Sequence, residues 1–184
     1  PKIGTRVTVF AGQGGLAEYG YFPSDRLIEI PDTMPSEVAA GFQVAYGTSH
    51  LALKHCAGLK KNNTLLVLGA AGGVGLTAVE LGKYFGAQVL AAARGEEKSK
   101  IAQEFCADVL IDTNTDNLVE VVKSLGGADV VYDPIGGELF KEAMRACKPE
   151  AKILTIGFAS GDIPSIAANH LLVKNLSVIG LNWG

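Results

Sequence analysis

Paired cysteines are missing from this sequence. Cys56, Cys106 and Cys147 are the only cysteines, they lie far apart, and no CxxC motif occurs. Three isolated cysteines provide neither a disulfide framework nor the closely spaced ligands of a structural zinc site. This usage is typical of a reducing compartment, and it predicts a cytoplasmic protein.

Long apolar runs and an excess of one charge are missing as well. No run reaches the roughly 18 apolar residues that span a bilayer, and no secretory signal pattern is present. Lys and Arg number 16 against 19 Asp and Glu, a net charge of −3. We therefore expect neither a membrane nor a nucleic acid as a partner. An initial Met is also absent, and "PKIGTRVTV" begins in what resembles mid-strand, so we expect an internal piece of a longer protein.

Hydrophobic residues are plentiful, at 48% of the 184 residues, which is enough for a sizeable core. After Asn63, short apolar runs alternate with segments of helical spacing, and Gly86 and Gly126 stand where helices would end. Continuous apolar runs indicate strands buried on both faces, as in a parallel sheet covered by helices. The pattern predicts an α/β fold: a doubly wound Rossmann sheet of six parallel strands with helices on both faces. The runs are residues 64–70, 87–93, 107–112, 128–133, 151–158 and 175–183.

The beginning of the chain has a different composition. It alternates apolar and polar residues, is rich in glycine and carries Pro23 and Pro31, which predicts short antiparallel strands. A helical pattern follows from residue 35. We therefore expect a β-rich segment over residues 1–34 and the α/β domain over residues 35–184.

A glycine-rich stretch, "GAAGGVG" (residues 69–75), separates the first apolar run from a helical pattern. A phosphate-binding P-loop would require Lys and then Ser or Thr after the last glycine, and Leu76 and Thr77 stand there instead. The dinucleotide motif G-x-G-x-x-G fits residues 70–75, with alanine in the first glycine place. In that motif the helix N-terminus holds the pyrophosphate, and the alternative is a tight turn without a ligand. The candidate residues are Ala71, Gly72, Gly73, Val74 and Gly75.

The end of the second predicted strand bears on the choice of nucleotide. An NAD site places Asp or Glu there to bind the ribose hydroxyls, but the sequence has Ala93 followed by Arg94. Arg94 or Lys98 could pair with a 2′-phosphate, so the pattern favours NADP(H) over NAD(H). The alternative is that Arg94 is a solvated surface residue and that Lys98 pairs along its own helix.

Several segments together resemble the quinone oxidoreductase (zeta-crystallin-like) branch of the medium-chain dehydrogenases/reductases. They are "RVTVFAGQGGLAEYGYFPSDRLIEIPD", "VAYGTSHLAL", "GAAGGVGLTAVELGK", "VVYDPIGGELF" and "IGFASGDIPSIAANHLLVKNLSVIGLNWG". The resemblance covers nearly the whole chain in order. It implies that residues 1–34 are the tail of a GroES-like catalytic domain and that the remainder is a Rossmann domain.

The resemblance also implies roles for individual residues. Thr48 resembles a threonine near the nicotinamide, and Lys98 matches a lysine that contacts the 2′-phosphate in members that use NADPH. Thr113 stands where such members commonly have a tyrosine, a departure that counts against NADPH. The alternative for Thr48 is a hydroxyl that bonds its own helical turn. Further cofactor-binding candidates follow two predicted strands, where the crevice of such a sheet opens: Pro134, Ile135, Gly157 and Phe158.

A metal site is not expected. Residues 41–48, where zinc-dependent relatives place a cysteine ligand, contain neither Cys nor His. His50 is close to this stretch but alone, and His55 and His170 have no partner at ligand spacing. The implied activity is a zinc-independent, NADPH-dependent transfer of hydride to a quinone or a conjugated enone, and no residue of this segment is assigned a catalytic role. Two alternatives are an enoyl or acryloyl thioester reductase and a non-catalytic cofactor-binding protein with a structural or RNA-binding role. The resemblance further implies a homodimer joined at the edge of the sixth strand.

Overall fold

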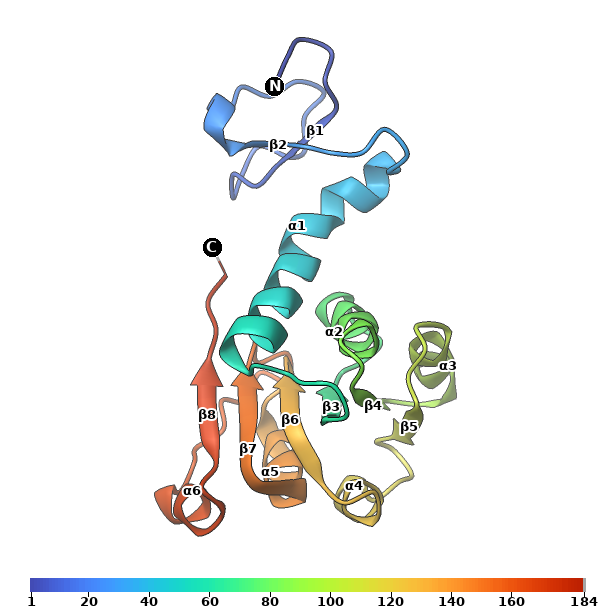
Figure 1. Cartoon of the computed structure of the whole chain (residues 1–184), viewed down its shortest axis with the longest axis vertical. Helices are drawn as coiled ribbons and strands as arrows, with labels where there is room; N and C mark the ends of the chain where they lie inside the picture. Colours follow the sequence, from blue (N-terminus) through green and yellow to red (C-terminus); the bar gives the residue numbers. More distant parts are fainter. Residues whose placement is uncertain (184) are drawn as a thin grey trace. The chain divides into compact units, whose positions relative to one another are not determined.

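A computed structural model describes residues 1–183 of the chain (Figure 1). These residues form two compact units, one of residues 1–48 with Trp183 and the other of residues 49–182. The expected boundary at residue 35 coincides with the beginning of helix α1 (Ser36–His50), whereas the two units divide inside this helix, between Thr48 and Ser49.

The first unit contains the short antiparallel strands that the sequence predicts. Strand β1 (Val7–Val9) pairs with β2 (Leu27–Glu29), which follows the 3₁₀ turn η1 (Ser24–Arg26). The Arg6 guanidinium donates hydrogen bonds of 2.7 Å to the carbonyls of both Asp32 and Met34. These bonds hold the segment between β2 and α1.

The second unit is the expected α/β fold, with six parallel strands in the spatial order β5-β4-β3-β6-β7-β8. One face is covered by the π-helical turn η2 and by α2 and α3, and the other by α4, α5 and α6 (Figure 1). The strands are β3 (Thr64–Leu68), β4 (Gln88–Ala93), β5 (Val109–Asp112), β6 (Ala128–Asp133), β7 (Cys147–Thr155) and β8 (Ser177–Gly180). The helices are η2 (Leu51–Cys56), α2 (Gly73–Tyr84), α3 (Glu96–Glu104), α4 (Leu118–Ser124), α5 (Gly137–Ala146) and α6 (Ala168–Lys174).

The central strand β3 explains why its sequence is apolar without alternation. Leu66 and Leu68 pack into the cluster beneath α4 and α5, whereas Leu65 and Val67 pack into the cluster beneath α2 and η2. All four side chains are fully buried. Burial of such a side chain stabilises the folded state by about 1.5–3 kcal/mol.

Strand β7 begins earlier than the apolar pattern indicates. The pattern extends the preceding helix to Cys147, but α5 ends at Ala146 and Cys147 is already extended, with φ −67° and ψ 145°. Pro149 disfavours helical backbone at the residue before it, which explains why the helix stops here. Cys147 is nevertheless buried in the core.

The strand order places a topological switch point between β3 and β6. The chain leaves β3 to form β4 and β5 on one side, and it returns to form β6, β7 and β8 on the other. In open α/β sheets the ligand crevice lies at this point, beyond the carboxyl ends of the strands. Within residues 1–183, the helices are all too short or too polar to cross a membrane.

Candidate functional site: a nucleotide crevice

The glycine-rich loop leads directly from β3 into the N-terminus of α2. Gly69 adopts φ +59°, and the Gly72 amide donates to the Gly69 carbonyl at 2.9 Å, which closes a turn. Leu76 donates to the Gly72 carbonyl at 2.8 Å. The amides of Gly73, Val74 and Gly75 therefore precede the intrahelical ladder, and no side chain caps this end of the helix. Such a terminus attracts an anion through its amides and its dipole.

Gly75 occupies a position that only glycine can fill without a shift of the backbone. A Cβ atom there would lie 2.3 Å from the Gly69 carbonyl oxygen and 2.9 Å from the Ala70 Cα. By contrast, a Cβ atom on Gly73 would meet nothing within 4 Å. The close approach at Gly75 brings the first turn of α2 against the end of β3.

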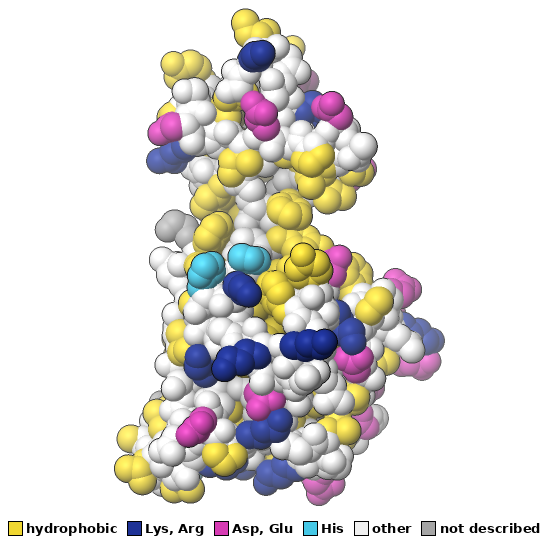
Figure 2. All heavy atoms as spheres, in the orientation of Figure 1, with side chains coloured by type: hydrophobic (Ala, Val, Ile, Leu, Met, Phe, Trp, Pro, Cys, Tyr) yellow, Lys and Arg dark blue, Asp and Glu magenta, His cyan; other side chains and the backbone are white. Residues whose placement is uncertain are grey.

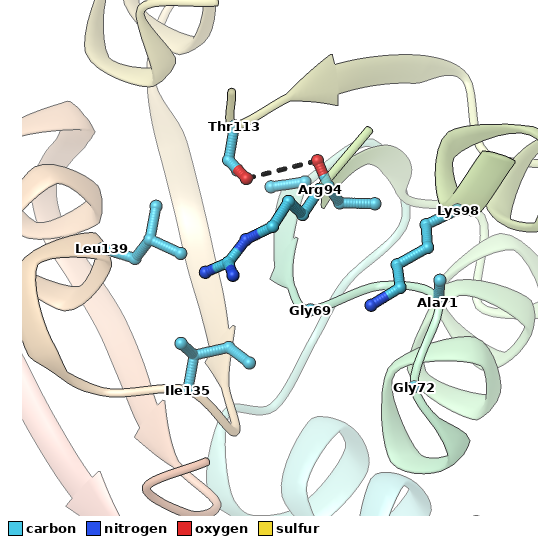
Figure 3. Close-up of a pocket in the computed structure, with 10 residues that line it drawn as sticks. Gly69, Ala71, Gly72, Arg94, Lys98, Thr113, Ile135 and Leu139 are labelled. Atoms are coloured by element: carbon cyan, nitrogen blue, oxygen red, sulfur yellow. Dashed lines mark hydrogen bonds between the residues drawn. The ribbon is translucent and has the colours of Figure 1, made fainter. Parts of the chain in front are cut away.

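A pocket of about 270 Å³ opens beside this loop (Figure 3). Figure 3 shows the Arg94 side chain extending between Thr113, Leu139 and Ile135, and the Lys98 ammonium group on the side of the loop. Within residues 1–183, neither basic side chain forms an ion pair. Both charges are therefore available to an anionic ligand. The lining residues are Gly69, Ala71, Gly72, Ala92, Ala93, Arg94, Lys98, Thr113, Ile135 and Leu139.

Hydrogen bonds from the end of β5 fix the backbone around Arg94. The amide and hydroxyl of Thr113 donate to the Ala93 carbonyl at 2.9 and 3.3 Å. The Asp112 Oδ1 accepts from the amides of Gly95 at 2.8 Å and Asn114 at 2.9 Å. These amides lower the pKa of the Asp112 carboxyl, because they stabilise its ionised form.

Two loops meet on the other side of the switch point, after β6 and β7. The Ile156 amide donates to the Asp133 carbonyl at 2.8 Å, and the Ala159 amide donates to the Pro134 carbonyl at 3.0 Å. Gly157 lies against Pro134, because its Cβ position is 3.4 Å from the Pro134 carbonyl oxygen. The predicted residues of the two loops are thus neighbours in space.

Asp133 supports the β6 loop from inside the protein. Its Oδ1 accepts the amides of Ile135 at 2.8 Å and Gly136 at 2.9 Å. The side chain is fully buried, and its Oδ2 has no hydrogen-bond partner within residues 1–183. Burial raises the pKa of Asp133, although the two amides oppose that rise.

The structure brings most of the predicted site residues together around the switch point. Those that line the pocket are Ala71, Gly72, Ala93, Arg94, Lys98 and Ile135, and those in the first turn of α2 are Gly73, Val74 and Gly75. Pro134, Gly157 and Phe158 lie in the paired loops after β6 and β7.

Thr48 belongs to the first unit and is not among the pocket residues. Its hydroxyl donates to the Val44 carbonyl of its own helix at 2.6 Å, which is the alternative that the sequence left open. Sequence reasoning missed Gly69, Ala92 and Leu139. Gly69 could have been included, because it directly follows the strand and opens the glycine stretch.

No group of three or more His, Cys, Asp or Glu side chains within residues 1–183 could hold a metal ion. The rings of His50 and His55 are 5.9 Å apart, with an interplanar angle of 63°. Figure 2 shows histidine side chains (cyan) next to one another on the visible face.

Comparison with known proteins places the chain in a family. The zinc-binding dehydrogenase family model matches residues 73–184. Quinone oxidoreductase-like protein 2 homolog of Nematostella vectensis is 42% identical, over 98% of this chain and 51% of its own length. Acryloyl-coenzyme A reductase of Sulfurisphaera tokodaii is 27% identical, over 91% of this chain and 49% of its own length.

A solved structure agrees with these relatives. The quinone oxidoreductase of Thermus thermophilus, which was also solved in complex with NADPH, superimposes with a TM-score of 0.85 at 31% identity, covering 97% of this chain and 57% of its own. The chain thus spans about half the length of the relatives it matches. Because the family model matches more than half of its residues, the chain belongs to the zinc-binding dehydrogenase family. Within it, the chain is a segment of a quinone oxidoreductase-like medium-chain dehydrogenase/reductase.

Proposed function

We propose that this chain supplies the nucleotide-binding part of a zinc-independent, NADPH-dependent oxidoreductase that transfers hydride to a quinone or a conjugated enone. The observation that carries the proposal is the position of Arg94 and Lys98, which form no ion pair within residues 1–183, beside the N-terminus of α2 around one pocket. The solved relative from Thermus thermophilus, with its NADPH complex, supports the same cofactor.

The residues present fit a dinucleotide phosphate. The amides of Gly73, Val74 and Gly75 would hold the pyrophosphate, and Arg94 and Lys98 would hold the 2′-phosphate. The tip of β4 carries no carboxylate that would repel this phosphate. When bound, NADPH would supply the hydride. The protein would contribute orientation, and Ile135 and Leu139 would give the pocket an apolar wall.

Zinc independence is part of the proposal, although the family carries a zinc-binding name. Its support is the composition of residues 41–48, which lack Cys and His, and the lack of a ligand cluster within residues 1–183. Cytoplasmic location is also proposed, because the three cysteines are free. The edge position of β8 supports the proposed homodimer.

A thioester reductase is the second candidate function. The likeness to an acryloyl-coenzyme A reductase favours it, at a lower identity than the quinone oxidoreductase-like relatives. A non-catalytic RNA-binding role is less well supported, because the chain has a net charge of −3.

An assay of the whole protein tests the proposal. Oxidation of NADPH and of NADH is followed with a panel of quinones, enones and acryloyl thioesters, and the chain is titrated with both nucleotides. We expect faster turnover and tighter binding with NADPH, with a quinone or an enone as acceptor. Preference for NADH would contradict the cofactor assignment, and turnover confined to thioesters would favour the second candidate. Binding of RNA without any turnover would support the non-catalytic role.

A further inference from the structure

Three hydroxyl groups meet in the interior of the second unit, behind the glycine-rich loop. They come from Ser49 at the end of α1, Thr77 in α2 and Tyr132 in β6. Ser49 and Tyr132 are completely buried, and Thr77 is 5% exposed. Buried hydroxyls in an otherwise apolar layer are costly unless they are hydrogen-bonded, so their arrangement calls for a physical reason.

The three hydroxyls bond one another and one backbone carbonyl. Ser49 Oγ lies 2.8 Å from Thr77 Oγ1 and 2.9 Å from the Tyr132 hydroxyl. Ser49 Oγ and Thr77 Oγ1 each lie 3.0 Å from the Val74 carbonyl oxygen, to which both are placed to donate. The network therefore ends on the first turn of α2.

In each of the two hydroxyl–hydroxyl bonds either oxygen can be the donor, and the protonated phenol allows one continuous direction. A phenol with the ordinary pKa of 10 keeps its proton at neutral pH, and burial raises the pKa of Tyr132 further, to about 12. Tyr132 can then donate to Ser49, which leaves the Ser49 and Thr77 protons for Val74 or for each other. A chain of this kind polarises its members in turn, and it orients the final acceptor.

We infer that Ser49, Thr77 and Tyr132 are positioning residues that fix the Val74–Gly75 peptide for recognition of the nucleotide pyrophosphate. The Val74 carbonyl and the Gly75 amide belong to the same peptide group, so a hydrogen bond to the carbonyl orients and polarises the amide. That amide is one of the three at the uncapped end of α2. The inference rests on the proposed NADPH function and deepens it, since it assigns an internal support to the pyrophosphate subsite.

Variants that remove single hydroxyls test this network. Tyr132→Phe keeps the ring, Thr77→Val keeps the branched shape, and Thr77→Ser restores a hydroxyl. Tyr84→Phe is the matched control for Tyr132→Phe, because it makes the same chemical change at a side chain that is 82% exposed. Tyr84 lies in α2, as Thr77 does. Dissociation constants are measured for NADPH and for adenosine 2′-monophosphate, which carries the 2′-phosphate but no pyrophosphate, and circular dichroism verifies folding.

We expect Tyr132→Phe and Thr77→Val to weaken NADPH binding by roughly three- to tenfold, with unchanged affinity for adenosine 2′-monophosphate. Thr77→Ser and Tyr84→Phe should bind NADPH as the wild type does. Wild-type affinity for NADPH in folded Tyr132→Phe, or an equal loss of affinity for both ligands, would overturn the role of the hydroxyl network. Either result would leave the proposed NADPH function standing. A wild-type chain that binds no NADPH would overturn the proposed function and this inference together.

Discussion

Lys98 and Lys100 are two residues apart on α3, yet they differ in their surroundings. Lys98 lines the pocket and forms no ion pair with any residue that the structure describes, whereas Lys100 forms an exposed ion pair with Glu96 at 2.8 Å. We expect Lys98→Ala to weaken NADPH binding by about 1.5–3 kcal/mol, the range for hydrogen bonds to a charged group. NADH has no 2′-phosphate, so its affinity should not change. Fluorescence titration with both nucleotides measures the difference.

Lys100→Ala is the matched control, since it removes the same charge from the same helix outside the pocket. Its NADPH affinity should equal that of the wild type. A similar loss in both variants would mean that the effect is a general one of charge, and that Lys98 does not touch the 2′-phosphate.

Asp133 is the residue at which pH dependence is expected. Because burial raises its folded-state pKa above the ordinary value of 3.8, ionisation is more costly in the folded than in the unfolded state. The resulting loss of stability is absent below pH 3.8 and develops as the pH rises through the folded-state pKa. Asp133→Asn keeps an Oδ1 acceptor for Ile135 and Gly136 without the charge. Relative to wild type, its free energy of unfolding should therefore be larger at about pH 7 than at about pH 3.5, which means that the variant gains stability at the higher pH.

Urea unfolding of both proteins at the two pH values measures this difference. The comparison between pH values removes any constant effect of placing an amide nitrogen at the former Oδ2 position. If the difference in free energy of unfolding between Asp133→Asn and wild type is the same at both pH values, ionisation of Asp133 does not contribute to the pH dependence of stability.

At the scale of elements, the contact between α2 and β3 depends on Gly75. Gly75→Ala would place a methyl group 2.3 Å from the Gly69 carbonyl oxygen, which only a shift of the backbone can relieve. Overpacking of this kind costs about 1–3 kcal/mol of the free energy of unfolding. Gly73→Ala, two residues earlier with open space around its Cβ position, should stay within about 0.5 kcal/mol of wild type. Equal stability of the two variants in urea would contradict the close approach.

The sequence predicted the elements of the second unit well, because its signals were local. Each strand contains a short apolar run, and Gly86 and Gly126 adopt the positive φ angles, +79° and +92°, of residues that follow a helix. The beginning of β7 was misplaced because Cys147 continues an apolar helical spacing, and periodicity alone does not register the effect of Pro149.

The candidate site was predicted less completely, and for a different reason. Loop residues that follow a strand could be named from the pattern, as with Arg94 and Ile135. Leu139 in α5 enters the pocket through the return of the chain across the switch point, which is a tertiary effect without a local signal. The Ser49–Tyr132 hydrogen bond joins residues 83 positions apart, and no spacing rule predicts such a contact.

For the whole molecule, β8 is the edge that a second copy could extend. Leu181 donates to the Thr155 carbonyl at 3.1 Å. Since amides alternate in direction along a strand, Val178 points its amide away from β7. Val178→Pro would remove an outward donor without loss of a bond to β7, and it should convert an edge-paired dimer to a monomer in light scattering. Wild-type protein that is monomeric at micromolar concentration would contradict the dimer.

Ile179→Pro is the contrasting variant, because the same alternation directs its amide toward β7. It should lower the stability of the fold itself, as measured by thermal unfolding. If Val178→Pro remains dimeric, the interface lies on another surface of the protein.

Trp183, the single tryptophan of the chain, lies against α1, since a Cβ atom on Gly47 would be 2.7 Å from its ring. Both residues belong to the first unit, and residues 49–182 contain no tryptophan. The protein therefore carries a built-in optical reporter for its smaller unit. In urea, tryptophan emission should shift at a lower concentration than far-ultraviolet circular dichroism, which follows mainly the second unit with its two buried clusters. Coincident transitions would instead mean that the two units unfold as one cooperative system.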